Sequence, residues 1–154
     1  MAVDDARTAF WIACSKGNEG IVRLLLSVKK IVEVLNKPNL DGESPLYTAC
    51  QQGHGKVVMV LLREKKVDVN QKQKEGLSPL VMAARNGNME MIKMLLASGR
   101  HFDQLDWSPL THVNPAVPKE VSSLLRSYAA NKFRVVKDLR TEISKKIQIC
   151  SFYR

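Results

Sequence analysis

Ser44-Pro45-Leu46-Tyr47-Thr48-Ala49-Cys50-Gln51-Gln52-Gly53-His54 is a stretch that this chain contains in three versions. The next version reads Ser78-Pro79-Leu80-Val81-Met82-Ala83-Ala84-Arg85-Asn86-Gly87-Asn88, and a looser one comes first as Thr8-Ala9-Phe10-Trp11-Ile12-Ala13-Cys14-Ser15-Lys16-Gly17-Asn18. A second apolar stretch that ends in two leucines follows each version. The equivalent alanines at positions 13, 49 and 83 lie 36 and 34 residues apart. A nearly fixed period of this length is typical of stacked supersecondary units.

Each version predicts a helix with a defined start and a sharp end. Ser44 is a residue type that accepts a hydrogen bond from the free amides of a helix start. Pro45 follows at the first helical position, where a missing N–H costs nothing. Gly53 ends the helix because glycine adopts the left-handed conformation readily. The apolar residues beyond it recur at helical spacing, so the unit is a helix, a tight turn and a second helix.

Polar segments that end in glycine connect the units, at residues 34–42 and 67–76. A short alternation such as Val67-Asp68-Val69 followed by turn-forming residues is typical of a hairpin-like loop.

These residues resemble the ankyrin repeat. The family pattern Thr-Pro-Leu-His-x-Ala-Ala-x-x-Gly-His is matched by residues 44–54, and its Leu-Leu followed by Asp-Val-Asn is matched by residues 61–62 and 68–70. The resemblance covers about residues 4–128. It implies an all-α ankyrin-repeat solenoid, built of helix-turn-helix repeats with hairpin-like loops, plus a C-terminal helix.

The chain departs from the family pattern at two places. Trp11, Tyr47 and Val81 stand where the family usually has a histidine that bridges neighbouring helices, so the bonds of that histidine are not expected. A fourth version opens at residues 108–111, but the prolines of segment 114–118 must cut its first helix short. A degenerate last repeat is typical of a capping position.

We therefore expect two parts. Residues 1–128 form an ankyrin-repeat domain with about three full repeats and one degenerate C-terminal repeat, and residues 129–154 form a basic amphipathic C-terminal helix or tail. Helices are expected at about 8–15, 19–27, 45–52, 56–64, 79–86, 89–97, 119–128 and 132–146. The tail helix is expected to turn Phe133, Val136, Leu139 and Ile143 towards the fourth repeat. A helix that binds a partner or a membrane surface is the alternative, and residues 147–154 carry no signal for either structure or role.

The charge of the chain is uneven. Its formal net charge is +9, and residues 119–154 hold nine Lys or Arg against three acidic residues. Such a tail could favour nucleic acid, acidic partners or an anionic membrane surface, although a solvated helix face explains it as well. Nothing near the N-terminus resembles a signal peptide, and the apolar runs are too short to span a bilayer. We expect an intracellular protein, cytoplasmic and/or nuclear.

The sequence offers no catalytic chemistry. No two of the three histidines have a metal-ligand spacing, and no Cys-x-x-Cys occurs. Cys14 and Cys50 occupy the same repeat position, but stacked helices lie about 8–10 Å apart and a disulfide needs α-carbons within about 7 Å. We expect two free buried thiols, no enzyme activity, no cofactor and no metal.

The family resemblance implies a protein-protein interaction module, an adaptor or scaffold that binds a protein partner of unknown identity through its concave groove and hairpin tips. The tip positions are Pro38, Leu40, Asp41, Glu43, Lys72, Lys74, Glu75 and Leu77, and the groove positions are Ser15, Lys16, Gln51, Gln52, Arg85 and Asn86. Leu40 and Leu77 are the sharpest of these, because an apolar side chain at a solvent-facing tip has no packing role. The alternative function is a basic adaptor that docks on nucleic acid or an acidic surface through the C-terminal tail.

The first helix predicts an apolar N-terminal face. A helix turns about 100° per residue, so Phe10, Trp11 and Ile12 cannot all point into one interface. We expect Phe10 in the core, Trp11 half-buried beside the second repeat, and Ile12 exposed. This surface would recruit a partner, a second copy of the chain by self-association, or an upstream segment. The alternative is that residues 1–7 fold back and cover it.

Overall fold

The structure is a computed structural model that describes residues 7–100 and 118–152. Those residues form helices joined by turns and loops, without any strand. The helices are α1 (Ala9–Ser15), α2 (Glu19–Leu26), the short 3-10 helix η1 (Lys29–Glu33), α3 (Pro45–Gln51), α4 (Gly55–Arg63), α5 (Pro79–Arg85), α6 (Met89–Ala97), α8 (Lys119–Ala130) and α9 (Lys132–Phe152). The all-α ankyrin solenoid is confirmed, and η1 is an element that the sequence pattern did not predict.

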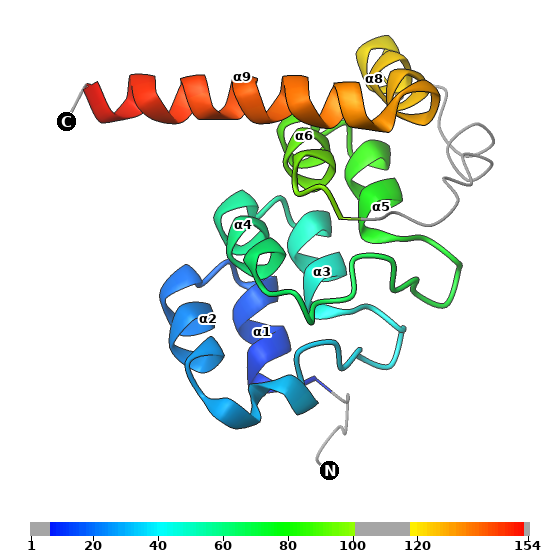
Figure 1. The fold of residues 1–154 in the computed structure, drawn as a ribbon. Helices are drawn as coiled ribbons and strands as arrows, with labels where there is room; N and C mark the ends of the chain where they lie inside the picture. Colours follow the sequence, from blue (N-terminus) through cyan, green and yellow to red (C-terminus); the bar gives the residue numbers. More distant parts are fainter. Residues whose placement is uncertain (1–6, 101–117, 153–154) are drawn as a thin grey trace.

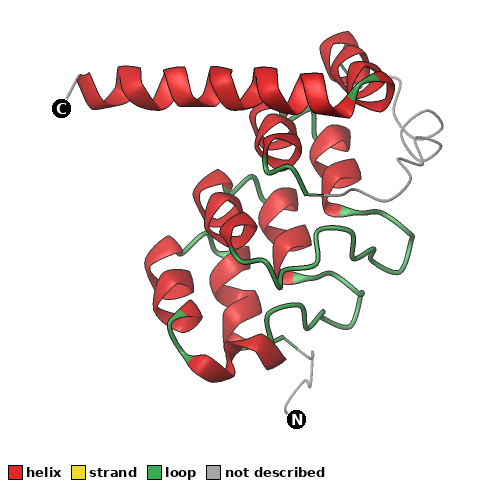
Figure 2. Ribbon diagram, in the orientation of Figure 1, coloured by secondary structure: helices red, strands yellow, loops and turns green. Residues whose placement is uncertain are grey.

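The helices form two stacked layers. In one layer α3 packs between α1 and α5, and in the other α4 packs between α2 and α6. Figure 1 shows these pairs stacked along one axis, with α9 lying across the end of the stack at α6. The long connecting loops project to the same side of the stack, as the loop colouring of Figure 2 shows.

The first helix of every pair begins at the predicted cap. The hydroxyls of Thr8, Ser44 and Ser78 each accept a hydrogen bond from the backbone N–H three residues later, at 3.0, 3.1 and 3.3 Å. This bond satisfies one of the amides that a helix start leaves without a partner.

The turn between the two helices of a pair also links neighbouring repeats. Gly17 has a φ of 69°, which glycine adopts without strain. A Cβ at this position would lie 2.5 Å from the imidazole of His54, so only glycine leaves room for that ring. The Nε2 of His54 lies 2.9 Å from the backbone oxygen of Ser15 and connects the second repeat to the first.

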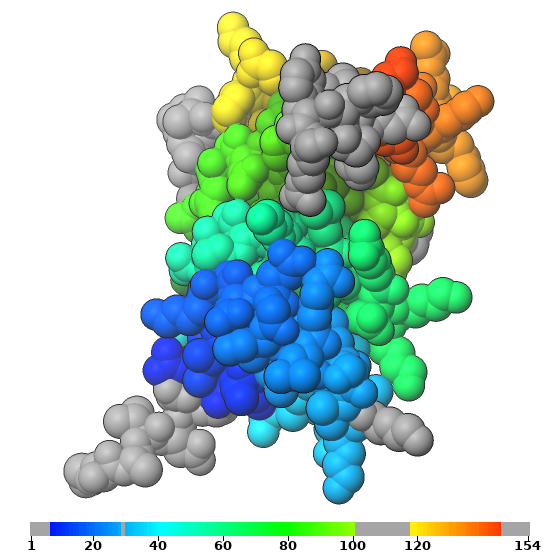
Figure 3. All heavy atoms as spheres, turned by 90° about the vertical axis from the view of Figure 1, so that its left-hand side faces the viewer, coloured from blue at the N-terminus to red at the C-terminus, as the bar shows by residue number. Residues whose placement is uncertain are grey.

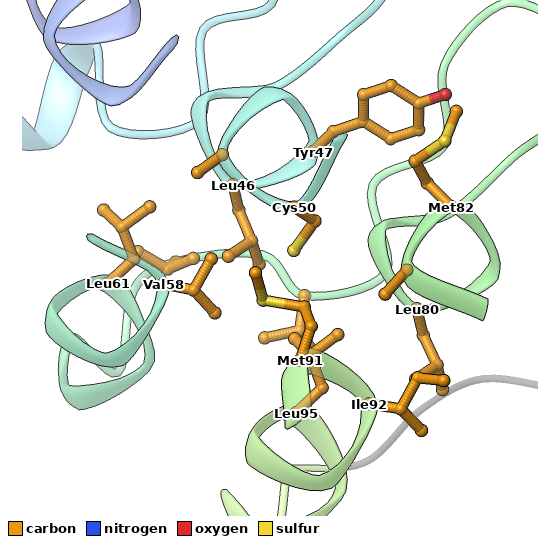
Figure 4. Packing of buried hydrophobic residues seen from close by; sticks show 14 of the residues in the cluster. Leu46, Tyr47, Cys50, Val58, Leu61, Leu80, Met82, Met91, Ile92 and Leu95 are labelled. Carbon is orange, nitrogen blue, oxygen red and sulfur yellow. The ribbon is translucent and has the colours of Figure 1, made fainter. Parts of the chain in front are cut away.

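The core runs through the stack between the two layers. Figure 4 shows Leu46 of α3, Val58 and Leu61 of α4 and Met91 of α6 gathered in one cluster of buried side chains. Small residues at Cys14, Cys50 and Ala84 let the helices of neighbouring repeats lie close. Both cysteines are free, as expected. Burial raises the pKa of Cys14 to about 12 and also raises the pKa of Cys50.

The C-terminal helices cover the last repeat. Helix α9 packs against α6 and α8, and Leu139 is 5% exposed. The guanidinium of Arg140 donates to the backbone oxygen of Ala97 at 2.9 Å, at the end of α6. Lys93 Nζ forms an ion pair with Glu142 Oε1 at 2.7 Å. The predicted tail helix is confirmed, and it runs on past residue 146 to Phe152.

One expectation about this helix is wrong. Phe133 is 89% exposed and does not face the repeats, whereas Val136, Leu139 and Ile143 do. At 3.6 residues per turn, Phe133 lies about 120° around the helix from Leu139, outside the buried face. Val135, which lies on that face, packs against the core instead.

The first helix of the degenerate fourth repeat, predicted from residues 108–118, falls almost wholly outside the described residues. Its second helix is present as α8, two residues longer than expected, and buries Val121 and Leu125. Among the described residues, no helix combines the length and the hydropathy that crossing a membrane requires.

Candidate protein-binding groove

Two hairpin-like loops form one wall of the candidate site. In the first loop, Asn39 N–H donates to the backbone oxygen of Glu43 at 3.1 Å, and Asn39 Oδ1 accepts the N–H groups of Asp41 and Glu43 at 3.0 and 2.9 Å. In the second, Gln73 N–H donates to the backbone oxygen of Leu77 at 3.0 Å. One asparagine or glutamine therefore shapes each hairpin.

The two hairpins are also bonded to each other. Lys74 N–H donates to the backbone oxygen of Asp41 at 3.1 Å. Gly42 lies so close to the second hairpin that a Cβ there would be 3.0 Å from the nitrogen of Lys74. These contacts fix the side chains of both hairpins as one surface.

A groove of about 380 Å³ lies between these hairpins and the helices α3 and α5. Tyr47, Leu77 and Met82 are buried and form its apolar part. Figure 4 shows the hydroxyl of Tyr47 pointing away from the core, beside the side chain of Met82. The polar side chains that complete the lining are Asp41, Glu43, Gln51, Gln73, Lys74, Glu75 and Arg85.

Two of the three carboxylates of the groove, those of Glu43 and Glu75, are held by amides rather than by cations. Glu43 Oε2 accepts from Asn39 Nδ2 at 2.9 Å, and Glu43 Oε1 accepts from Gln51 Nε2 at 3.3 Å. Glu75 Oε2 accepts from Gln73 Nε2 at 3.3 Å. Neither carboxylate forms an ion pair within the described part of the chain, so their charge remains available to a ligand.

The hydroxyl of Tyr47 is influenced by both walls of the groove. Burial raises its pKa, a hydrogen bond with the Gln73 side chain lowers it, and the charges of Glu43 and Glu75 raise it while that of Arg85 lowers it. Arg85 is exposed on α5 and faces these carboxylates across the groove. Charges of both signs thus surround one apolar floor.

Half of the residues predicted from the family register line this groove. These seven are Asp41, Glu43, Gln51, Lys74, Glu75, Leu77 and Arg85. Leu40 is 56% exposed, as expected of a hairpin tip.

The expectation for Leu77 is wrong. It was expected to be a solvent-facing tip, but only 6% of its surface is exposed and it belongs to the core cluster. The chain has already returned to the helix layer at this point, because Ser78 is the N-cap of α5. Leu77 therefore packs beneath the groove rather than projecting from it.

Seven predicted positions lie outside the groove: Ser15, Lys16, Pro38, Leu40, Gln52, Lys72 and Asn86. Asn86 has a structural bond, since its Nδ2 donates to the backbone oxygen of Gln51 at 3.0 Å. The backbone oxygen of Ser15 is the hydrogen-bond partner of His54 Nε2 described above. Lys16, Gln52 and Lys72 are exposed.

Sequence reasoning missed three residues that line the groove, Tyr47, Gln73 and Met82. It also underestimated Trp11, which is 6% exposed rather than half-buried. The indole Nε1 donates to the backbone oxygen of Glu43 at 2.8 Å. The burial of Trp11 could have been predicted from its residue type at the bridging position, because the N–H group of a buried tryptophan usually finds a hydrogen-bond partner.

Comparison with known proteins finds ankyrin repeats in two overlapping stretches. A sequence model described as ankyrin repeats (3 copies) matches residues 2–73, and one described as ankyrin repeats (many copies) matches residues 56–96.

Three similar proteins illustrate the relatives. The chain is 35% identical over 95 residues to the ankyrin repeat and KH domain-containing protein mask-1 of Caenorhabditis elegans, which covers 62% of the chain and 4% of that protein. It is 30% identical over 115 residues to the human transient receptor potential cation channel subfamily A member 1, and this match covers 72% of the chain and 10% of that protein. It is 34% identical over 116 residues to the E3 ubiquitin-protein ligase XBAT33 of Arabidopsis thaliana, and this match covers 75% of the chain and 22% of that protein.

The chain spans less than a quarter of the length of each of these relatives, which share its repeats. The ankyrin repeat is in general a non-catalytic fold that binds other proteins. The two sequence matches, the three stacked helix pairs and the hairpins that join them show that this chain belongs to the ankyrin-repeat family.

Proposed function

We propose that the chain is an adaptor or scaffold that binds a segment of a partner protein in the groove between its two hairpins and helices α3 and α5. The observation that carries this proposal is the unpaired charge on both walls. Glu43 and Glu75 on one side and Arg85 on the other form no ion pair in the described structure.

The chemistry of the groove favours a particular kind of segment. The apolar floor of Tyr47, Leu77 and Met82 suits an aliphatic or aromatic side chain. A basic side chain would meet Glu43 and Glu75, and an acidic one would meet Arg85. Because the hairpins are bonded to each other and to Trp11, this surface is largely formed before a partner arrives, which reduces the entropy cost of binding.

A pull-down with a matched pair of variants tests this function. The groove variant carries Glu75→Lys with Arg85→Glu, and the control carries Lys56→Glu with Glu64→Lys at the two ends of α4, outside the groove lining. Each variant keeps the net charge of the parent, and all four side chains are exposed. We expect at least one protein to be captured by the parent and the control and to be lost from the groove variant, with unchanged helical circular dichroism. Capture of the same proteins by all three would contradict the proposal.

A second candidate function rests on α9. Phe133 is almost fully exposed, and it lines a hollow of about 380 Å³ with Lys137 and Arg140. An exposed aromatic ring among basic side chains can stack on a base while the cations meet phosphates. Docking on nucleic acid or another acidic surface through this helix is therefore the alternative.

Titration against single-stranded and duplex DNA at two salt concentrations distinguishes this alternative. Binding through phosphates weakens steeply as the salt concentration rises, and it should also weaken in Phe133→Ala and Lys137→Ala. Binding that is absent, or that is insensitive to both salt and these substitutions, excludes the alternative.

A further inference from the structure

The first repeat presents an apolar face on the side where the stack begins. Ile12 of α1 is 46% exposed, and Ile21 and Leu24 of α2 are 45% and 68% exposed. We call these three residues the N-terminal face. Figure 3 shows the atoms of the first repeat at one end of the molecule. Val28 and Val32, at 50% and 45% exposure, add apolar surface beyond the end of α2.

The repeat register shows what this face corresponds to. The equivalents of Ile12, Ile21 and Leu24 in the second repeat are Thr48, Val57 and Val60, and in the third repeat they are Met82, Met91 and Met94. The second-repeat residues are 1%, 0% and 5% exposed, and Met82 and Met91 are 7% and 1% exposed. Met94 is partly buried.

The difference in burial comes from the neighbouring repeat. Helix α4 packs against α2, and α6 packs against α4. A Cβ at Gly55, which begins α4, would lie only 3.1 Å from Met94 Cε. The position of Met94 thus contacts the second helix of the preceding repeat, and its equivalent Leu24 points to where a preceding repeat would lie.

The residue types at this face match an internal repeat and not a terminal one. A terminal repeat normally turns a polar surface to solvent. Here all three positions carry branched aliphatic side chains, which are as apolar as the residues that fill the two complete interfaces. The structure contains two interfaces between neighbouring repeats, and the N-terminal face has the same kind of residues as one side of each. The other side of this third interface is not supplied by the described residues.

A second copy of this chain does not supply the missing side in the same geometry. The surface that would fit is the C-terminal side of a final repeat. In this chain α9 packs against α6 and buries Leu139 there, and Arg140 is bonded to the end of α6.

We propose that the N-terminal face binds an ankyrin-type repeat of a partner protein, by stacking against the open C-terminal side of that repeat. The partner is recognised by its helix pair, whose aliphatic and small residues complete the interface that α2 and α4 form here. This site is separate from the groove, so one molecule of this chain can bind a partner at each site at the same time.

The probe for this proposal is a consensus-sequence ankyrin array of three repeats that lacks a C-terminal cap. The same array with a polar C-terminal cap is its matched control. Sedimentation velocity and calorimetry of the full chain should show a one-to-one complex with the uncapped array alone. Leu24→Glu should weaken binding at least about tenfold, because it places a carboxylate in an apolar interface.

Two variants of the full chain complete the test. Phe133→Glu changes another exposed apolar residue, at the other end of the molecule, and should leave binding of the array unchanged. The groove variant Glu75→Lys with Arg85→Glu should also bind the array normally, so failure of the proposed function and failure of this inference are distinguishable. Equal binding of the capped array, or no binding of either array, would overturn the inference. Self-association of the chain alone that Leu24→Glu abolishes would assign the face to a second copy instead.

Discussion

One register position, where the family usually has a bridging histidine, is occupied by Trp11, Tyr47 and Val81. The three side chains differ in how they contact the next hairpin. The indole of Trp11 donates to the backbone oxygen of Glu43, and the hydroxyl of Tyr47 lies towards the next hairpin, where the Gln73 side chain lowers its pKa. Val81 is buried and carries no polar group. The family's usual histidine is therefore replaced by two side chains that reach the next hairpin, and by one that only packs.

The bond of Trp11 predicts a stability effect. Trp11→Phe keeps most of the buried ring but removes the indole donor, so the backbone oxygen of Glu43 keeps the N–H of Asn39 as its remaining donor. The loss of this one hydrogen bond costs about 0.5–1.5 kcal/mol. Urea denaturation measures this loss. Ile12→Val, at the exposed neighbouring position, is the control and should change stability by less than about 0.5 kcal/mol. Equal stability of Trp11→Phe and the parent would show that the bond contributes nothing.

The two buried thiols predict a loss of stability at alkaline pH. Burial raises the pKa of Cys14 to about 12 and raises that of Cys50, whereas an unfolded thiol titrates near 8.5. Below that pH both states keep their protons and the stability is complete. Above it only the unfolded chain releases protons, so the free energy of unfolding falls by up to about 1.4 kcal/mol per pH unit for each thiol.

Alanine variants isolate this effect from the tyrosines and lysines that titrate in the same range. Ala84 fills the equivalent position of the third repeat, so Cys14→Ala with Cys50→Ala is compatible with the fold. Urea denaturation between pH 7.5 and pH 10, values chosen to bracket the thiol range, should give a shallower pH dependence for this variant. Parallel curves for parent and variant would refute the assignment.

At the scale of single elements, the sequence predicts the bounds of the helices better than it predicts which residues of the connecting loops are buried. The caps at Thr8, Ser44 and Ser78 and the glycine turns set six helices within a residue or so of their expected bounds. These signals are local, so they can be seen in the chain itself. Leu77 was misjudged because its burial depends on how the hairpin returns to the helix layer, which no local pattern encodes.

The same distinction applies to the candidate site. Seven residues that the family register predicted line the groove, Gln51 and Arg85 as groove positions and the other five as hairpin-tip positions. The register could not place Gln73, because Gln73 reaches the groove only through the position of the second hairpin beside Tyr47 of the preceding repeat. The periodicity of α9 indicated an amphipathic helix, but the orientation of Phe133 followed only from how that helix packs on α6.

Helix α9 supports a matched prediction at this scale. Leu139 is buried against the last repeat and Phe133 is exposed. Leu139→Ala should therefore lower the free energy of unfolding by about 2–4 kcal/mol through lost burial and the cavity left behind. Phe133→Ala should lower it by less than about 0.5 kcal/mol. Chemical denaturation of both variants measures the difference, and equal effects would mean that α9 does not cap the stack.

The whole molecule is asymmetric along its stacking axis. At one end α8 and α9 bury the apolar side of the last repeat, and at the other end Ile21 and Leu24 remain exposed. In a repeat protein each unit is stabilised mainly by its immediate neighbours. The middle repeat has two such neighbours, whereas the first repeat has one, so local stability is expected to decline towards α2.

Native-state hydrogen exchange tests this gradient. Amides at the centres of α4 and α6 should exchange only in the most costly openings, because both helices are covered on each side. The central amides of α2 should exchange faster, through opening of the first repeat alone. Adding the uncapped ankyrin array should slow exchange in α2 more than in α6, since it would give the first repeat its second neighbour. Uniform protection along the stack would show that the chain opens as one unit. Faster exchange in α9 than in α2 would show that the C-terminal end of the stack, and not the first repeat, is the less stable one.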